Sequence, residues 1–266
     1  EVSNEPKQTE PVDVEEILRQ AKRLGSVEWI YFEGGEPFLH YPILLHGIRE
    51  ASSGGFSVGV VTNAYWATGV EGAVTWLRPM AGLIEDLSVS TDRFHGNDPP
   101  DQKADHARVA AARLGIPAET IAVAQPGQQD DALAPLMYRG RAAVELADRV
   151  PHQRWDTFSA CPYEDLRDPG RVHIDPLGHA HLCQGLSLGS VFSAPLEQRC
   201  SNWDPDEHPI VGPLIRGGPA ALVRRYAVPH RPAYADACHL CYETRLALRS
   251  RFPEILTPDQ MYGPSR

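Results

Sequence analysis

The chain has 266 residues, a formal net charge of -10 at pH 7 and 42% hydrophobic residues. This length suits one large domain, or a domain of about 150 residues with a smaller companion, and the composition allows a sizeable core. The acidic balance argues against nucleic acid as a partner, because phosphates would be repelled by the average surface. No run of about twenty apolar residues and no signal-like start occurs, so we expect a cytoplasmic protein without a membrane partner.

Strand and helix patterns alternate along the first half of the chain. The predicted strands cover residues 27–32, 57–62, 86–90 and 120–124, and the predicted helices cover 12–24, 41–52, 70–77 and 101–114. Gly25, Gly54 and Gly115 follow three of these helices, and we expect each to end its helix in the left-handed conformation. Strand–helix pairs of this length predict an α/β fold with a parallel sheet, either a partial or complete barrel or a doubly wound sheet.

The alternation of strands and helices ends at about residue 150, where we place a boundary between domains 1–150 and 151–266. The second domain is expected to contain a β-hairpin, a loop rich in Pro, Asp and Gly, and a helix that follows a CxxC pair. These elements are the hairpin 171–183 with its turn at 175–178, the loop 194–220 and the helix 242–251.

Four of the five cysteines form a ligand-like pattern, in which Cys161 precedes Cys183 and the pair Cys238-His-Leu-Cys241. Thiolates are soft ligands, CxxC lets two sulfurs converge on one centre, and a hairpin presents Cys183 rigidly, so the pattern predicts a metal site. An iron-sulfur cluster and a four-cysteine zinc ion both fit it. Cys200 stands in a polar segment, and we expect a free thiol there. Four nearby histidines could add ligands or hydrogen-bond donors, although each is more typical of a strand or surface: His173, His179, His181 and His239.

The predicted strand 27–32 runs into Gly34-Gly35-Glu36-Pro37. The carboxyl ends of parallel strands form the ligand-binding edge of a sheet, so this turn lies where a cofactor would bind. Two glycines allow the backbone to approach a ligand closely, and Glu36 supplies a carboxylate for an ammonium group. The alternative is a plain strand-to-helix turn with an exposed acid.

This turn, followed by Thr62-Asn63 and by residues 86–92 at the ends of the next two strands, resembles the radical S-adenosyl-L-methionine (radical SAM) enzymes. The resemblance extends over residues 12–125 and implies a partial parallel (β/α) barrel. It places the amino group of the cofactor's methionine end against Gly34-Gly35-Glu36-Pro37. The side chains that it places near the cofactor's ribose or carboxylate are Asn63, Ser90 and Asp92.

The cysteine pattern resembles the auxiliary-cluster appendage of the same enzymes, in the short form known as the twitch subdomain. The longer SPASM form would have another cysteine six residues after the CxxC, where this chain has Ala247. The resemblance therefore implies one auxiliary iron-sulfur (4Fe-4S) cluster in a small C-terminal hairpin-plus-helix subdomain. Its ligands would be Cys161, Cys183, Cys238 and Cys241.

Radical SAM enzymes hold their catalytic cluster in a CxxxCxxC motif, which does not occur in these 266 residues. In the family's order the motif precedes the helix predicted at 12–24, so we expect it upstream of Glu1. The resemblance implies reductive cleavage of the cofactor, hydrogen-atom abstraction from a substrate, favoured here as a peptide or protein, and a reductant such as ferredoxin or flavodoxin. No catalytic residue is assigned. The alternative is a catalytically inactive, zinc-stabilised binding module derived from the same scaffold.

Two further groups of residues could contribute to a site. Arg139 and Arg141 could offer a guanidinium to a carboxylate or form a surface pair at a helix start, and the arginine-rich stretch 216–251 is more typical of a solvated or internally paired face. Tyr65 and Trp66 follow a strand end, where they could cover a ligand or pack in the core.

Overall fold

A computed structural model describes residues 11–91, 102–128 and 133–263 of the chain. These residues form a mixed α/β structure in two compact units. The first unit holds residues 11–91, 102–124 and 133–134, and the second holds 125–128 with 135–263. The segment 135–150, which the sequence assigned to the first domain, therefore lies in the second unit.

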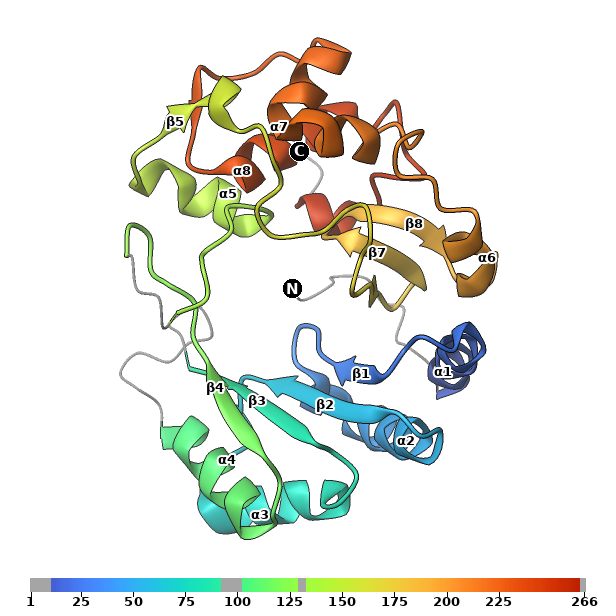
Figure 1. Ribbon diagram of the computed structural model, residues 1–266. Coiled ribbons are helices and arrows are strands. Elements are labelled where there is room, and N and C mark those ends of the chain that lie inside the picture. The colour runs from blue at the N-terminus through green and yellow to red at the C-terminus, as the bar shows by residue number, and fades with distance from the viewer. Residues whose placement is uncertain (1–10, 92–101, 129–132, 264–266) are drawn as a thin grey trace. The chain divides into compact units, whose positions relative to one another are not determined.

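The first unit is built on a parallel sheet whose strands follow one another in chain order, β1-β2-β3-β4. The strands are β1 (Trp29–Phe32), β2 (Ser57–Thr62), β3 (Asp86–Ser90) and β4 (Ala118–Ile121). The helices are α1 (Pro11–Leu24), η1 (Pro37–His40), α2 (Tyr41–Ser53), α3 (Val70–Leu77), η2 (Arg78–Met80) and α4 (Gln102–Arg113). Figure 1 shows α2, α3 and α4 on the same side of this sheet.

The core of the first unit lies between the sheet and these helices. Val58 and Val60 of β2 and Leu87 and Val89 of β3 are fully buried in it. Because successive side chains of a strand point to opposite faces, the residues between them face the other side of the sheet. On β1 that side carries Trp29 and Tyr31, which are 42% and 46% exposed.

Most elements of the first unit lie where the sequence predicts them, and strands 57–62 and 86–90 and helix 70–77 agree residue by residue. The fourth strand lies at 118–121, two to three residues before its predicted place, because its pairing with β3 begins at Ala118. Gly25 and Gly115 are left-handed as predicted, with φ of 76° and 68°. The prediction for Gly54 was wrong: its φ is -68°, because its N–H still bonds to Glu50 O within the last helical turn.

The second unit combines small antiparallel sheets with helices. Its strands are β5 (Gln153–Arg154), β6 (His173–Ile174), β7 (His179–Cys183), β8 (Leu186–Ser190) and β9 (Ala233–Tyr234), paired as β5-β9 and β6-β7-β8. Its helices are α5 (Arg141–Glu145), η4 (Ala147–Arg149), η5 (Trp155–Thr157), α6 (Leu196–Ser201), α7 (Val211–Tyr226), α8 (Ala237–Leu248) and η6 (Asp259–Tyr262). A second apolar core, to which Leu182, Ile210, Leu222 and Leu248 belong, holds this unit together.

The hairpin predicted at 171–183 is present as β6 and β7, whereas the third strand, β8, was not predicted. The loop predicted at 194–220 was wrong, since much of it forms α6 and α7. Its loop-like composition comes partly from residues 217–219, Gly-Gly-Pro, at which α7 departs from helical geometry. A side chain at Gly218 would lie 2.3 Å from Ala160 N, so this glycine lets α7 pack against the backbone just before Cys161.

The last predicted helix also starts earlier than residue 242. Helix α8 begins at Ala237, because the Asp236 side chain accepts a hydrogen bond from His239 N at 2.7 Å and caps the helix. Cys238 and Cys241 therefore lie within the helix and not before it. Within the described residues, no helix has both the length and the apolar character needed to cross a bilayer.

Candidate functional site

A small polar pocket of about 50 Å³ opens at the carboxyl ends of β1, β2 and β3. Three consecutive strands contribute to it because parallel strands all end at the same edge of a sheet. The pocket brings together five of the predicted cofactor-binding residues, whereas Pro37 begins η1 beside it and Asp92 lies outside the described residues. The residues that line it are Gly34, Gly35, Glu36, Val61, Thr62, Asn63 and Ser90.

The carboxylate of Glu36 is fixed in this pocket and is only 7% exposed. Its Oε1 accepts hydrogen bonds from Thr62 Oγ1 at 2.8 Å and from Phe38 N at 3.1 Å, and its Oε2 accepts one from Asn63 N at 2.7 Å. The alternative of an exposed acid was therefore wrong. Asn63 contributes its backbone N–H here, while its side-chain oxygen accepts from Tyr65 N at 2.9 Å.

Thr62 orients Glu36, although the sequence did not single it out as a site residue. Its hydroxyl oxygen accepts hydrogen bonds from Trp66 Nε1 and from Ala64 N, both at 3.0 Å, which leaves its proton for Glu36. Trp66 is 4% exposed and stacks on Phe38 with ring centroids 4.4 Å apart, so it packs in the core. A threonine at the end of a buried strand was the only sequence signal for this role.

The four cysteines predicted as metal ligands come together in the second unit from three separate segments. Cys161 follows η5, Cys183 ends β7, and Cys238 and Cys241 lie in α8. Cys161, Cys183 and Cys241 pack against the core of this unit. Burial raises the pKa of the Cys238 thiol, and the nearby Asp236, Cys241 and Cys183 raise it further. The fifth cysteine, Cys200, is exposed on α6.

Two arginines approach these thiols. Arg139 Nη1 donates to Cys183 Sγ at 3.0 Å, and Arg245, which donates from Nη1 to Gln184 O at 2.8 Å, is near enough to Cys241 to affect the pKa of its thiol. Burial raises the pKa of Cys241 to about 11, against the lowering effect of Arg245. Without a bound metal, Cys241 is therefore a neutral thiol at pH 7. The sequence suggested that Arg139 could bind a carboxylate, and in the structure its guanidinium also contacts the Cys183 thiol.

Arg245 is the more unusual of the two arginines. It is 2% exposed, makes no ion pair with a carboxylate of the described residues, and its Nε lacks a hydrogen-bond partner among them. Arg139, in contrast, lies 4.0 Å from Glu164. A buried cation is costly unless an anion compensates it, and thiolates on a metal would supply that charge. As predicted, the arginine-rich stretch is solvated at Arg224 and internally paired at Arg231 and Arg249; Arg245 is also bonded within the chain, but its burial was not predicted.

One compact group of metal-ligating side chains occurs in residues 11–91, 102–128 and 133–263: the ligand atoms of Asp175, His179 and His181 all lie within 4.8 Å of one another. The sulfurs of the four cysteines do not meet this distance criterion. No three of their sulfurs therefore lie within 4.8 Å of one another, whereas four Zn–S bonds of about 2.3 Å place all four sulfurs of a tetrahedron about 3.8 Å apart. His239 contacts Glu243 Oε1 at 3.3 Å and accepts from Ala235 N at 3.3 Å.

Besides the Asp175, His179 and His181 group, the described residues contain two chemically distinct features, one in each unit. The first is a carboxylate held rigidly in a pocket at strand ends, which suits recognition of a cationic group. The second is a set of four thiols with two guanidinium groups beside it, which suits an anionic metal centre. Comparison with models of known protein families and with curated proteins finds no match to this chain, and the chemistry of these residues is therefore the guide to its function.

Proposed function

We propose that the protein is a radical SAM enzyme, which reductively cleaves S-adenosyl-L-methionine and abstracts a hydrogen atom from a substrate. The observation that carries the proposal is the pocket around Glu36, at the carboxyl ends of three consecutive parallel strands. The chain-order sheet, with α2, α3 and α4 on one side, supports a partial (β/α) barrel, because a doubly wound sheet would reverse its strand order and place helices on both faces.

In this proposal the residues of the pocket bind the amino-acid end of the cofactor. Glu36 Oε2 accepts one backbone hydrogen bond and keeps a lone pair for an ammonium group. Gly34, with φ of 139°, has no side chain to obstruct the approach of a ligand. Bound S-adenosyl-L-methionine supplies a 5'-deoxyadenosyl radical after reduction of its sulfonium. The CxxxCxxC motif that family members use for this reduction is not among the 266 residues, so no residue here is assigned to that step.

The thiol centre supports an auxiliary iron-sulfur cluster in the second unit. Cys161, Cys183, Cys238 and Cys241 would hold it, and the charge of Arg245 would compensate the negative charge of a cluster bound by four thiolates. A cluster also accepts sulfurs that are spaced more widely than those around a single zinc ion. Such a cluster supplies a second redox centre. A peptide or protein substrate and a ferredoxin or flavodoxin reductant belong to the same proposal.

Anaerobic reconstitution with iron and sulfide tests the metal centre. We expect the wild-type chain to bind about four irons with the broad visible absorption of a 4Fe-4S cluster. Cys238→Ser should lose this iron, whereas Cys200→Ser, a change at an exposed cysteine outside the site, should retain it. One tightly bound zinc with no uptake of iron would instead support the zinc-stabilised binding module.

Calorimetric titration of the reconstituted chain with S-adenosyl-L-methionine tests the pocket. Glu36→Gln removes the charge with little change of shape, and a lost charge-assisted hydrogen bond of about 1.5–3 kcal/mol should weaken binding at least about tenfold. Glu33→Gln, at an exposed glutamate three residues earlier in the chain, should leave the affinity unchanged. Equal affinities of the wild-type chain and Glu36→Gln would remove Glu36 from the site.

A further inference from the structure

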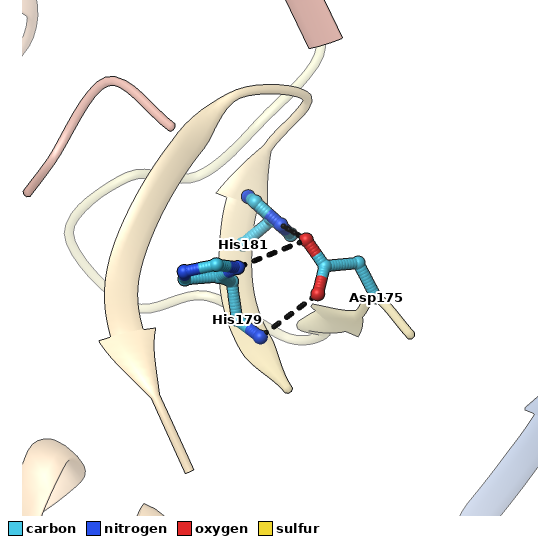
Figure 2. A group of neighbouring side chains, drawn as sticks. All are labelled: Asp175, His179 and His181. Atoms are coloured by element: carbon cyan, nitrogen blue, oxygen red, sulfur yellow. Dashed lines mark hydrogen bonds and ion pairs between the residues drawn. The ribbon is translucent and has the colours of Figure 1, made fainter. Parts of the chain in front are cut away.

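A second group of candidate ligands lies in the hairpin of the second unit, apart from the four thiols. Asp175 begins the turn between β6 and β7, and His179 and His181 lie on β7. Figure 2 shows both imidazole rings directed at one carboxylate oxygen of Asp175. His181 Nε2 lies 2.9 Å and His179 Nδ1 lies 3.2 Å from Asp175 Oδ2.

These separations are ordinary hydrogen-bond distances, and they also suit atoms that share a metal ion. Bonds of about 2.0–2.1 Å, typical of zinc with imidazole and carboxylate ligands, place neighbouring ligand atoms about 2.9–3.4 Å apart for octahedral to tetrahedral angles. The two measured nitrogen–oxygen distances fall in this range. Two imidazoles and one carboxylate also form the three-ligand set that catalytic zinc and non-haem iron sites use, with at least one coordination position left for another ligand.

The carboxylate is anchored by the turn itself. Asp175 Oδ1 accepts hydrogen bonds from Leu177 N at 2.8 Å and from His179 N at 2.9 Å, so Oδ2 is left to face the two rings. Ligating carboxylates are typically held by hydrogen bonds of this kind. Gly178 has φ of 82°, and the turn closes with its N–H donating to Asp175 O at 2.9 Å.

Asp175 and His181 are buried, which distinguishes this group from an ordinary ion pair on the protein surface. The side chains of Asp175 and His181 are 6% and 2% exposed, while His179 is 21% exposed and gives an ion a route from solvent. The Nδ1 atom of His181 is buried and has no hydrogen-bond partner in the described part of the chain. The ring is therefore oriented by its contact with Asp175 Oδ2.

The geometry points to a mononuclear site for a divalent transition-metal ion, such as Zn²⁺, formed by Asp175 Oδ2, His179 Nδ1 and His181 Nε2. The site shares no ligand with the cysteine centre, although Cys183 ends the same strand, and the proposal does not rest on the radical chemistry. Binding moves the proton of each imidazole to its other nitrogen, which in His181 is the unpartnered Nδ1. Loss of such outer hydrogen bonds costs about 10–100-fold in metal affinity, so we expect weaker binding than at a structural zinc site.

Equilibrium dialysis of the full reduced chain against Zn²⁺ counts the bound ions. We expect His179→Gln and His181→Gln each to bind one ion fewer than the wild-type chain, whether or not the thiols also take up zinc. The matched control is His173→Gln, at an exposed histidine that pairs with His181 across the hairpin, and it should bind as many ions as the wild type. An unchanged count in both the His179 and His181 variants would overturn the assignment.

A measurement on the wild-type chain avoids any loss of fold in the variants. Nitrogen-15 spectra of the imidazoles should show Zn²⁺ bound to Nδ1 of His179 and to Nε2 of His181, with the His181 proton moved to Nδ1. The resonances of His173 should not change. If zinc leaves the His179 and His181 resonances in place, the two rings bind Asp175 alone and the site does not exist.

Discussion

The Glu36 carboxylate owes its position to a series of hydrogen bonds that starts in the core. Trp66 donates to Thr62, and Thr62 donates to Glu36. Because Trp66 is held by its stacking on Phe38, these two hydrogen bonds fix the position of the carboxylate in the pocket. Each donor in this series has one acceptor, which leaves a single arrangement of the carboxylate. A site held in this way is ordered before a ligand arrives and loses little conformational entropy on binding.

Replacement of the Thr62 hydroxyl tests this series. Thr62→Val has nearly the same shape but removes the acceptor for Trp66 Nε1 and Ala64 N and the donor to Glu36. We expect a loss of about 1–3 kcal/mol in the free energy of unfolding, because buried polar groups are left unpaired. Thr62→Ser keeps the hydroxyl and should lose less. Urea denaturation followed by circular dichroism measures both, and equal stabilities of the two variants would show that the hydroxyl has no such role.

The start of helix α7 is capped by a partly buried histidine that lies three residues before it. His208 Nδ1 accepts hydrogen bonds from Ile210 N at 3.3 Å and Val211 N at 3.0 Å, which satisfies backbone groups at the start of the helix. This role requires a neutral imidazole. Burial lowers the pKa of His208 to about 4, so the ring stays neutral in the folded chain at pH 7.

The stability of this helix start should therefore depend on pH. Because the pKa of His208 is about 4 in the folded chain and about 6.5 when unfolded, the unfolded state binds more protons between these values, and stability falls as the pH is lowered through this window. His208→Asn keeps an acceptor but does not titrate. Urea denaturation at about pH 7 and pH 5 should show a larger loss for the wild type than for the variant. Parallel losses would assign the pH dependence to other groups.

The elements that the sequence predicts well are those defined by local patterns. The buried strands β2 and β3 and the helix α3 each have a continuous apolar pattern and clear ends, and their bounds agree with the prediction. Helix α7 was missed because residues 217–219 break its pattern, and the need for glycine at Gly218 comes from the backbone at Ala160, far away in the sequence. The start of α8 was missed although Asp236 is a normal capping residue.

In the whole molecule, the sequence identifies candidate ligands more easily than the groups that surround them. The spacing of the four cysteines and the place of Glu36 in a turn at a strand end were enough to select them as candidates. Arg245 lies 61 residues after Gln184, its backbone partner, and only the folded chain shows that it is buried beside the thiols. The same holds for Asp175, His179 and His181. The sequence predicts the turn and offers the two histidines as possible ligands, but only the structure shows that both rings contact one oxygen of Asp175.

The two compact units have separate cores: the Glu36 pocket lies in the first unit, and the cysteine centre and the Asp175, His179 and His181 site lie in the second. The four predicted cysteine ligands all lie in the second unit, so iron loading should stabilise that unit selectively. The gain is about 2.7 kcal/mol when the free ligand is a hundredfold above its dissociation constant. We expect slower amide hydrogen exchange in β7 and α8 after loading, and unchanged exchange in β2 and β3 of the first unit.

Hydrogen-exchange mass spectrometry of the chain before and after reconstitution measures this difference. Cys238→Ser, treated in the same way, should show no added protection in either unit, because it lacks a ligand at the first turn of α8. Cys200→Ser should behave like the wild type, since this cysteine is exposed on α6. Equal protection of β2, β3, β7 and α8 would instead mean that the two units unfold as one, and that the metal centre contributes to the stability of the Glu36 pocket as well.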